Sequence, residues 1–159
     1  MTIQIVKSGK PILFDSQDWK LISRYRWWVE SNGYAVTKRR VDGKYIKMHR
    51  LLLGIIDKPK ILTDHKNRIR SDNRIENIRP CSLSENARNR RAVGRSKYKG
   101  VSFQRFVSNG NVYEYIQARI RVDGRFIHLG RFETEERAAL AYNEAATKYF
   151  GEFANLNVL

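Results

Sequence analysis

A short segment near the middle of the chain holds side chains that could hydrolyse a phosphate ester. Asp64 and His65 are adjacent, and Asn86 follows after a polar stretch. Hydrolysis of a phosphodiester needs a base that activates water and a cation that stabilises charge on the phosphate and the leaving oxygen. Histidine has an ordinary pKa suited to the base, and the oxygens of aspartate and asparagine suit Mg2+ or Mn2+. An Asp-His pair by itself is usually structural, so this chemistry depends on the surrounding fold.

The residues around this pair predict two strands joined by a polar loop. Residues 61–62 predict a strand that leads into Asp64 and His65, and residues 75–79 predict the second strand. Five cations near the pair would hold a nucleic acid strand, namely Lys66, Arg68, Arg70, Arg74 and Arg79.

A helix is predicted directly after the second strand. Ser82 and Glu85 have the spacing of a capping box, in which each side chain bonds the backbone at the other's position. Asn86 would lie on the first turns of this helix. A strand, a loop, a strand and a helix in this order could bring Asp64, His65 and Asn86 together.

The charge of the chain favours nucleic acid as its partner. The net charge is +15, and cations at this density would neutralise phosphates and release counterions. A surface that serves solubility, or one that binds an anionic membrane, is an alternative that charge alone leaves open. Residues 1–97 hold 23 basic against 9 acidic residues, residues 98–131 hold 6 against 2, and residues 132–159 hold 2 against 5. A C-terminal module with one basic and one acidic element would turn its basic face toward a polyanion.

Composition limits the class of protein. With 159 residues, the chain suits one ordinary domain or two very small ones. Its 42% hydrophobic and 30% charged residues are typical of a globular protein. No apolar run approaches the roughly 18 residues that cross a bilayer, and no leader pattern opens the chain. The single Cys81 excludes an intrachain disulfide and a cysteine-based zinc site.

The first 48 residues predict mostly short strands separated by turns. Residues 42–43 are an Asp-Gly pair between strand-forming residues, which is a hairpin signal. Residues 48–54 predict a short helix. The three tryptophans, Trp19, Trp27 and Trp28, have apolar neighbours and are interpreted as core side chains.

The C-terminal part predicts a three-stranded antiparallel sheet packed on one helix. Residues 115–122 alternate between apolar and polar side chains, which is typical of a half-buried strand. Residues 98–106 predict a strand before a loop at 108–111, and residues 125–129 predict a strand after the Asp123-Gly124 turn. Thr134 predicts the helix N-cap. The apolar stripe of this helix and its stop are expected at Ala138, Ala141, Tyr142, Ala145, Ala146, Tyr149 and Gly151.

The polar face of this sheet could be an ordinary solvated surface. However, the sheet is basic and the helix behind it is acidic. This combination favours a polar face that binds DNA, because a sheet that carries arginines can enter the major groove. Residues 91–97 are basic, contain Gly and Ser and lack hydrophobic periodicity, so they predict a linker that could lie along DNA. Three arginines in and directly before this stretch are expected to contact DNA, namely Arg90, Arg91 and Arg95.

The segment from Asp64 to Asn89 resembles the ββα-metal core of HNH nucleases, in the variant in which asparagine replaces the last histidine. The positions that match are Asp64-His65, Asn77 and Asn86, with agreeing flanks at 48–51, 72–79 and 86–89. The resemblance implies that His65 is the general base and that Asp64 and Asn86 bind one divalent cation, Mg2+ or Mn2+ rather than zinc. It implies that Asn77 holds the His65 loop or orients the imidazole. The glycine that the family commonly has after Asp-His is replaced here by residues 67–69.

Two further residues lie where the same family pattern has a His-Arg pair. These are His49 and Arg50. The resemblance leaves two roles open for them, a contact to phosphate or simple packing.

Residues 98–157 are similar to the plant ethylene-response-factor (APETALA-type) DNA-binding domain. The matching stretches are residues 98–101, 118–121, 128–132, 138–143, 151, 153–154 and 156–157. The positions that the resemblance assigns to DNA contact are Lys99, Ser102, Gln104, Arg119, Arg121, Arg125 and His128. Several arginines and a tryptophan of the plant sheet are replaced, so the plant recognition sequence is not transferred.

Together, the two resemblances predict a two-domain α+β protein, with a nuclease domain at 1–90, a basic linker at 91–97 and a DNA-binding domain at 98–159. This order is similar to that of phage and intron-encoded homing endonucleases. We expect a monomeric, site-specific endonuclease in the cytoplasm of a bacterial or phage-infected cell, without a membrane or a small-molecule substrate. One active site per chain favours a nick in double-stranded DNA, and a double-strand break would need two chains or two events. A DNA-binding regulator with an inactive HNH core is the main alternative. A nuclease for structured RNA or of broad specificity is the second.

Overall fold

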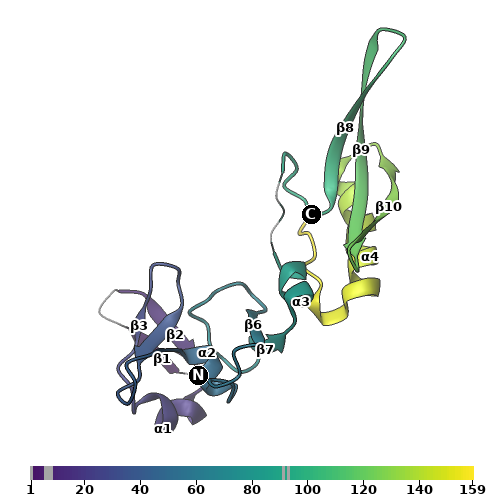
Figure 1. Ribbon diagram of the computed structural model, residues 1–159. Coiled ribbons are helices and arrows are strands. Elements are labelled where there is room, and N and C mark those ends of the chain that lie inside the picture. Colours follow the sequence, from purple (N-terminus) through teal and green to yellow (C-terminus); the bar gives the residue numbers. More distant parts are fainter. Residues whose placement is uncertain (1, 6–8, 91, 93) are drawn as a thin grey trace. The chain divides into compact units, whose positions relative to one another are not determined.

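The computed structural model describes residues 2–5, 9–90, 92 and 94–159. The chain divides into two compact units, Met1–Asn86 and Ala87–Leu159, which Figure 1 shows in purple to teal and in teal to yellow. Both units combine small antiparallel sheets with a few helices, so the predicted α+β class is confirmed. Among the described helices, none has the length and hydropathy needed to cross a bilayer.

The first unit begins with two small antiparallel sheets. Strand β1 (Thr2–Ile5) pairs with β2 (Pro11–Phe14), and β3 (Trp28–Val29), β4 (Ala35–Lys38) and β5 (Tyr45–Lys47) form a sheet in sequence order. A 3-10 turn η1 (Ser16–Asp18) and helix α1 (Trp19–Ile22) separate the two sheets, and α2 (Met48–Leu52) follows the second one. The prediction of short strands is confirmed, whereas η1 and α1 were not predicted because four helical residues are too few to show a helical period.

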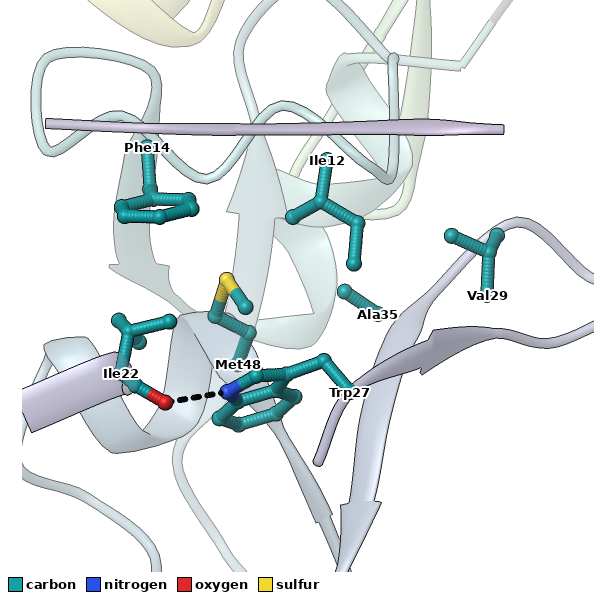
Figure 2. Close-up of a cluster of buried hydrophobic side chains, with 7 residues drawn as sticks. All are labelled: Ile12, Phe14, Ile22, Trp27, Val29, Ala35 and Met48. Atoms are coloured by element: carbon teal, nitrogen blue, oxygen red, sulfur yellow. Dashed lines mark hydrogen bonds between the residues drawn. The ribbon is translucent and has the colours of Figure 1, made fainter. Parts of the chain in front are cut away.

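A small hydrophobic core joins these elements. Ile12 and Phe14 project from the same face of β2 toward Met48 of α2, as Figure 2 shows. The buried indole of Trp27 donates from Nε1 to the carbonyl oxygen of Ile22 at 2.9 Å. Trp19 is 50% exposed and stacks on Phe14 at a centroid distance of 6.2 Å. The core prediction for Trp19 is therefore wrong, because this side chain covers the edge of the core from outside.

A second strand pair completes the first unit, and a short helix contains the boundary between the two units after Asn86. Strand β6 (Leu62–His65) pairs antiparallel with β7 (Ile78–Cys81), and helix α3 (Leu83–Arg88) follows. The predicted second strand at 75–79 begins later, because the backbone of residues 74–77 forms a turn in which Asn77 N donates to the carbonyl oxygen of Arg74 at 2.9 Å. The predicted capping box is present, since Ser82 N donates to Glu85 Oε2 and Glu85 N donates to Ser82 Oγ, at 2.7 and 3.2 Å.

The second unit is a three-stranded antiparallel sheet backed by one long helix. Strands β8 (Val101–Ser108), β9 (Asn111–Val122) and β10 (Arg125–Phe132) lie in the order β10-β9-β8, and α4 (Glu135–Phe150) leads into η2 (Gly151–Phe153). The predicted architecture of this part is confirmed. The predicted loop at 108–111 is wrong, because β8 and β9 continue to a two-residue turn in which Asn109 and Gly110 both have positive φ. Asn-Gly suits such a turn, whose twist matches that of the strands.

Helix α4 covers one face of this sheet with a stripe of small side chains. Thr134 is the N-cap, and its hydroxyl accepts from Arg137 N at 3.2 Å. The buried residues of the helix are Ala138, Ala139, Tyr142, Ala145, Ala146 and Phe150. Tyr149 is 40% exposed and Phe150 is buried instead, so the stripe ends one position later than predicted.

Candidate functional site

The Asp-His pair lies at the end of β6, opposite the start of β7. Asp64 is paired with Arg79 and His65 with Ile78. The ladder continues one step further, since Lys66 N donates to the carbonyl oxygen of Asn77 at 2.8 Å. Asp64 and His65 are only 6% and 5% exposed. The pair is therefore held by the sheet backbone on a rigid element rather than on a free loop.

The side-chain amide of Asn77 ties together the loop that follows His65. Its Oδ1 accepts from Asn67 N at 2.9 Å, and its Nδ2 donates to the carbonyl oxygen of Asp72 at 2.7 Å. Asn77 is 5% exposed, so both bonds are shielded from water. Arg68 has a φ of 64° at the place where the family commonly has glycine, and the tight turn is formed without that glycine.

Asp72 anchors the far side of the same loop. Its carboxylate is 1% exposed and accepts from Arg74 through Nε at 2.9 Å and Nη2 at 2.7 Å, and from Asn67 Nδ2 at 2.7 Å. The bidentate bond from Arg74 lowers the pKa of Asp72. The loop is also joined to β2, because Leu13 N donates to the carbonyl oxygen of Ser71 at 2.9 Å and Asn73 N donates to that of Leu13 at 2.7 Å.

The His65 imidazole lies among three residues that come from different parts of the sequence. Its Nε2 is 3.4 Å from Asn73 Oδ1. The His49 ring meets it edge-on, with a centroid distance of 5.0 Å, and the Tyr34 ring is 6.0 Å from it. Burial lowers the pKa of His65, although Asn73 and Asp64 act in the opposite direction. The ring is therefore a neutral base at neutral pH.

Sequence reasoning assigned no role to Tyr34 or Asn73. Asn73 belongs only to a flank of the family pattern, and Tyr34 follows a turn about 30 residues before the pair in the sequence. The contact of Tyr34 with both histidines depends on the folding of the β3–β5 sheet against α2, which no local pattern predicts.

The structure places His49 and Arg50 inside the first unit. His49 is 2% exposed, and burial, with the nearby positive charges of Lys47 and Arg50, lowers its pKa to about 3. Its Nδ1 is buried and has no hydrogen-bond partner among the described residues. The Arg50 guanidinium donates to the carbonyl oxygens of Ile61, Ile55 and Lys58, each at 2.8 Å.

Asp64 forms a buried ion pair with the residue opposite it in the ladder. Arg79 Nη2 and Nε lie 2.9 and 3.2 Å from Asp64 Oδ2, and the two side chains are 9% and 6% exposed. Asn86 is on α3 and is half-buried. In the part of the chain that the structure describes, no hydrogen bond joins Asn86 to Asp64 or His65.

The donor chemistry of these residues fits a hard divalent cation. Asp64 offers a carboxylate and Asn86 an amide oxygen, and both are ligand types that Mg2+ prefers. Among the described residues, no group of three or more His, Cys, Asp or Glu side chains could hold a metal ion. Mg2+ does not need such a cage, because it commonly keeps several waters and uses one or two protein ligands together with substrate phosphates.

Five of the residues predicted to meet DNA lie on the sheet face that α4 leaves open. Ala118 and Ile120 are buried against the helix, so their neighbours in β9, Arg119 and Arg121, project from the opposite face. The residues on this open face include Ser102, Gln104, Arg119, Arg121 and His128. Arg125 is paired with Val122, so it lies on the face of the sheet that α4 covers.

Two of the other residues predicted to contact DNA have partners within the second unit. Lys99 Nζ donates to the carbonyl oxygens of Arg88 and Arg90. Arg95 pairs with Glu114 and lies over the Phe103 ring at 4.3 Å. Arg91 lies outside the described residues.

Comparison with known proteins identifies the family. The chain is 30% identical, over 143 residues, to an uncharacterized HNH endonuclease of Acanthamoeba polyphaga mimivirus, and the match covers 87% of this chain and 70% of the relative. The chain therefore belongs to the HNH endonuclease family. No protein-family model matches the chain. No solved structure matches it. The HNH resemblance seen in the sequence is confirmed, whereas the likeness to the ethylene-response-factor domain stays a prediction.

Proposed function

We propose that this protein is a site-specific DNA endonuclease of the homing type that nicks one strand with a histidine base and one divalent cation. The observation that carries the proposal is the buried His65 next to Asp64, at the end of a strand whose following loop is fixed by Asn77. General-base catalysis needs a side chain whose position is fixed and whose pKa leaves it unprotonated at the working pH. The low pKa of His65 meets the second need.

In this mechanism His65 accepts the proton of the attacking water. Asn73 and His49 restrict the imidazole on two sides, and Asn77 holds the loop backbone. Asp64 and Asn86 would hold the cation. When bound, a divalent cation would stabilise the charge that develops on the phosphate and the leaving oxygen. Arg79 keeps the Asp64 carboxylate in place within the ladder.

The second unit would choose the position on double-stranded DNA. Its open sheet face presents Arg119, Arg121 and His128, all exposed, in the manner of an ethylene-response-factor domain. Arg90, Arg91 and Arg95 would add contacts to phosphates. Because both units belong to one chain, binding by one raises the effective concentration of the other at its site, and a monomer would suffice for a nick.

Incubation with a supercoiled plasmid library tests the proposal. Wild-type protein should convert plasmid to the nicked form with Mg2+ or Mn2+ and not with EDTA, and mapping of the ends should show discrete positions. The His65→Ala variant should bind the same DNA and leave it intact. Specific binding without cutting, in either metal, would contradict the endonuclease assignment and indicate a DNA-binding regulator. Cutting at random positions would indicate a nuclease of broad specificity.

A further inference from the structure

The hairpin of β8 and β9 is longer than the helix that supports the sheet. The two strands pair without interruption from Val101 and Ala118 to Ser108 and Asn111. The core of this unit uses Val101 of β8 and, from β9, residues from Ile116 onward. Residues 104–115 belong to neither core cluster, and Figure 1 shows this part of the hairpin projecting beyond α4 and β10. We call residues 104–115 the arm.

One face of the arm is a ladder of three aromatic rings, two of which are exposed. Phe106 and Tyr113 are directly paired across the strands and stack at a centroid distance of 5.1 Å, and Tyr115 is 5.9 Å from Phe106. Phe106 and Tyr113 are each 45% exposed. A stacked cross-strand pair of this kind contributes about 0.2–1 kcal/mol to the ribbon, and nearly half of each ring still faces outward, where a partner could contact it.

The ladder continues directly into the cationic face of the sheet. Tyr115 carries the Arg131 guanidinium over its ring at 4.2 Å, and further along the same face Phe126 lies under Arg119 and Arg121, at 4.6 and 5.5 Å. Glu114 is the one acidic residue in β8, β9 and β10, all of which the structure describes. It is paired with Arg105 and so lies on the opposite face. The aromatic face therefore carries arginines and no carboxylate.

We propose that the arm is a second DNA-binding element, whose aromatic ladder packs on the sugar and base surfaces of duplex DNA beyond the part held by the helix-backed sheet. This inference rests on the proposed function. The occupant must be anionic and also offer apolar surface, and duplex DNA has both, in its phosphates and in the sugars along its grooves. A second copy of the same face would oppose arginine to arginine, and a β-ribbon has the width that a DNA groove admits.

Contacts of this kind leave a distinct thermodynamic signature. Arginine contacts to phosphate release counterions, so they set the slope of log affinity against log salt. Aromatic contacts to bases and sugars release none. Removal of the ladder should therefore lower affinity at every salt concentration and leave the slope unchanged.

The test measures binding of the full chain to a mixed-sequence DNA duplex by fluorescence anisotropy, in EDTA and over a range of salt. Phe106→Thr with Tyr113→Thr should weaken binding about tenfold, because the apolar contact of two rings with the DNA is lost, at constant slope. The matched control, Val107→Thr with Val112→Thr, changes the neighbouring pair on the other face, 67% and 50% exposed, and should stay within about twofold. Arg119→Gln should instead reduce the slope by about one.

Wild-type affinity in the aromatic variant, or an equal loss in the valine control, would overturn the role of the ladder. Amide NMR spectra establish whether the arm is still folded. If the two threonine substitutions unfold the arm, the variant Phe106→Leu with Tyr113→Leu is used in their place. This leucine variant must also lose affinity. A wild-type chain that fails to bind DNA would overturn the proposed function itself, which separates that failure from the failure of the arm.

Discussion

At the scale of single residues, the state of His65 is set by neighbours that are distant in the sequence. The Asp-His spacing predicted the pair and its chemistry, and Asn77 was singled out with it. Burial under His49 and Tyr34, which makes the imidazole a neutral base, could not be predicted, because it depends on how the β3–β5 sheet and α2 pack. The ion pair of Asp64 with Arg79 likewise follows from strand register, which no local pattern gives.

The buried His49 should make the first unit sensitive to acid. Its pKa is about 3 in the folded chain, against 6.5 ordinarily. Between these values only the unfolded chain binds the proton, so the free energy of unfolding should fall as pH drops below about 6.5, by up to about 1.4 kcal/mol per pH unit for this residue. Urea unfolding followed by tryptophan fluorescence reports this unit alone, because Trp19, Trp27 and Trp28 all lie in it.

The matched variants for this measurement are His49→Phe and His128→Gln. The phenylalanine keeps a ring against His65 but cannot be protonated, so its pH dependence should be shallower. Exposed His128 in the other unit should leave the curve unchanged. Equal pH dependence in wild type and His49→Phe would contradict the burial of a neutral His49.

Asn77→Ala should loosen the loop after His65. It removes the acceptor of Asn67 N and the donor to the carbonyl oxygen of Asp72, and each backbone group left unpaired costs about 1–3 kcal/mol. The same fluorescence assay should show this loss, and amide exchange of Asn67 should accelerate. Exposed Asn111→Ala in the other unit is the control. Unchanged exchange at Asn67 would show that the amide does not hold the loop.

At the scale of elements, regular patterns were predictive and short or strained ones were not. The alternation in β9, the N-cap at Thr134 and the capping box at Ser82 correctly gave a sheet, a long helix and a short helix. The arm was missed because its Asn109-Gly110 turn was interpreted as a longer loop. Tyr149 and Phe150 are adjacent on the helix, and only the packing against η2 and the sheet decides which one is buried.

Gly100 should be essential for docking α4 on the sheet. Its φ is +78°, and an added Cβ would lie 2.0 Å from Tyr142 Cδ2 and 2.8 Å from the Arg119 carbonyl oxygen. Gly100→Ala should therefore cost several kcal/mol, well above the roughly 1–2 kcal/mol of left-handed strain alone. Thermal unfolding followed by far-ultraviolet circular dichroism measures the loss.

Gly110→Ala is the matched control for this substitution. Its φ is +74°, and nothing lies within 4 Å of its added Cβ. It should show the backbone strain without the clash. Similar losses in the two variants would contradict the close packing of Gly100 on the ring of Tyr142.

At the scale of the whole molecule, charge and chemistry are divided between the two units. Residues 1–97 carry most of the net positive charge, whereas residues 98–159 are nearly balanced, with 8 basic against 7 acidic residues. The sequence revealed this division and also the split of the second part into a basic sheet and an acidic helix, whereas the face on which Glu114 lies depends on strand register. Strand register concentrates arginines on one sheet face and places Glu114 on the other. We infer that the first unit supplies catalysis and general attraction to DNA, and that the second supplies position.

The most direct test of the central claim compares single-turnover cleavage by wild type, His65→Ala and His128→Ala on the mapped site, at saturating protein with Mg2+. Loss of a general base typically costs 10²–10⁴-fold, so His65→Ala should cut at least about 100-fold more slowly with an unchanged Kd. His128→Ala should weaken binding and cut at the wild-type rate once saturated. A His65→Ala protein that cuts at the wild-type rate would contradict the assignment of His65 as the base and, with it, the catalytic account of the first unit.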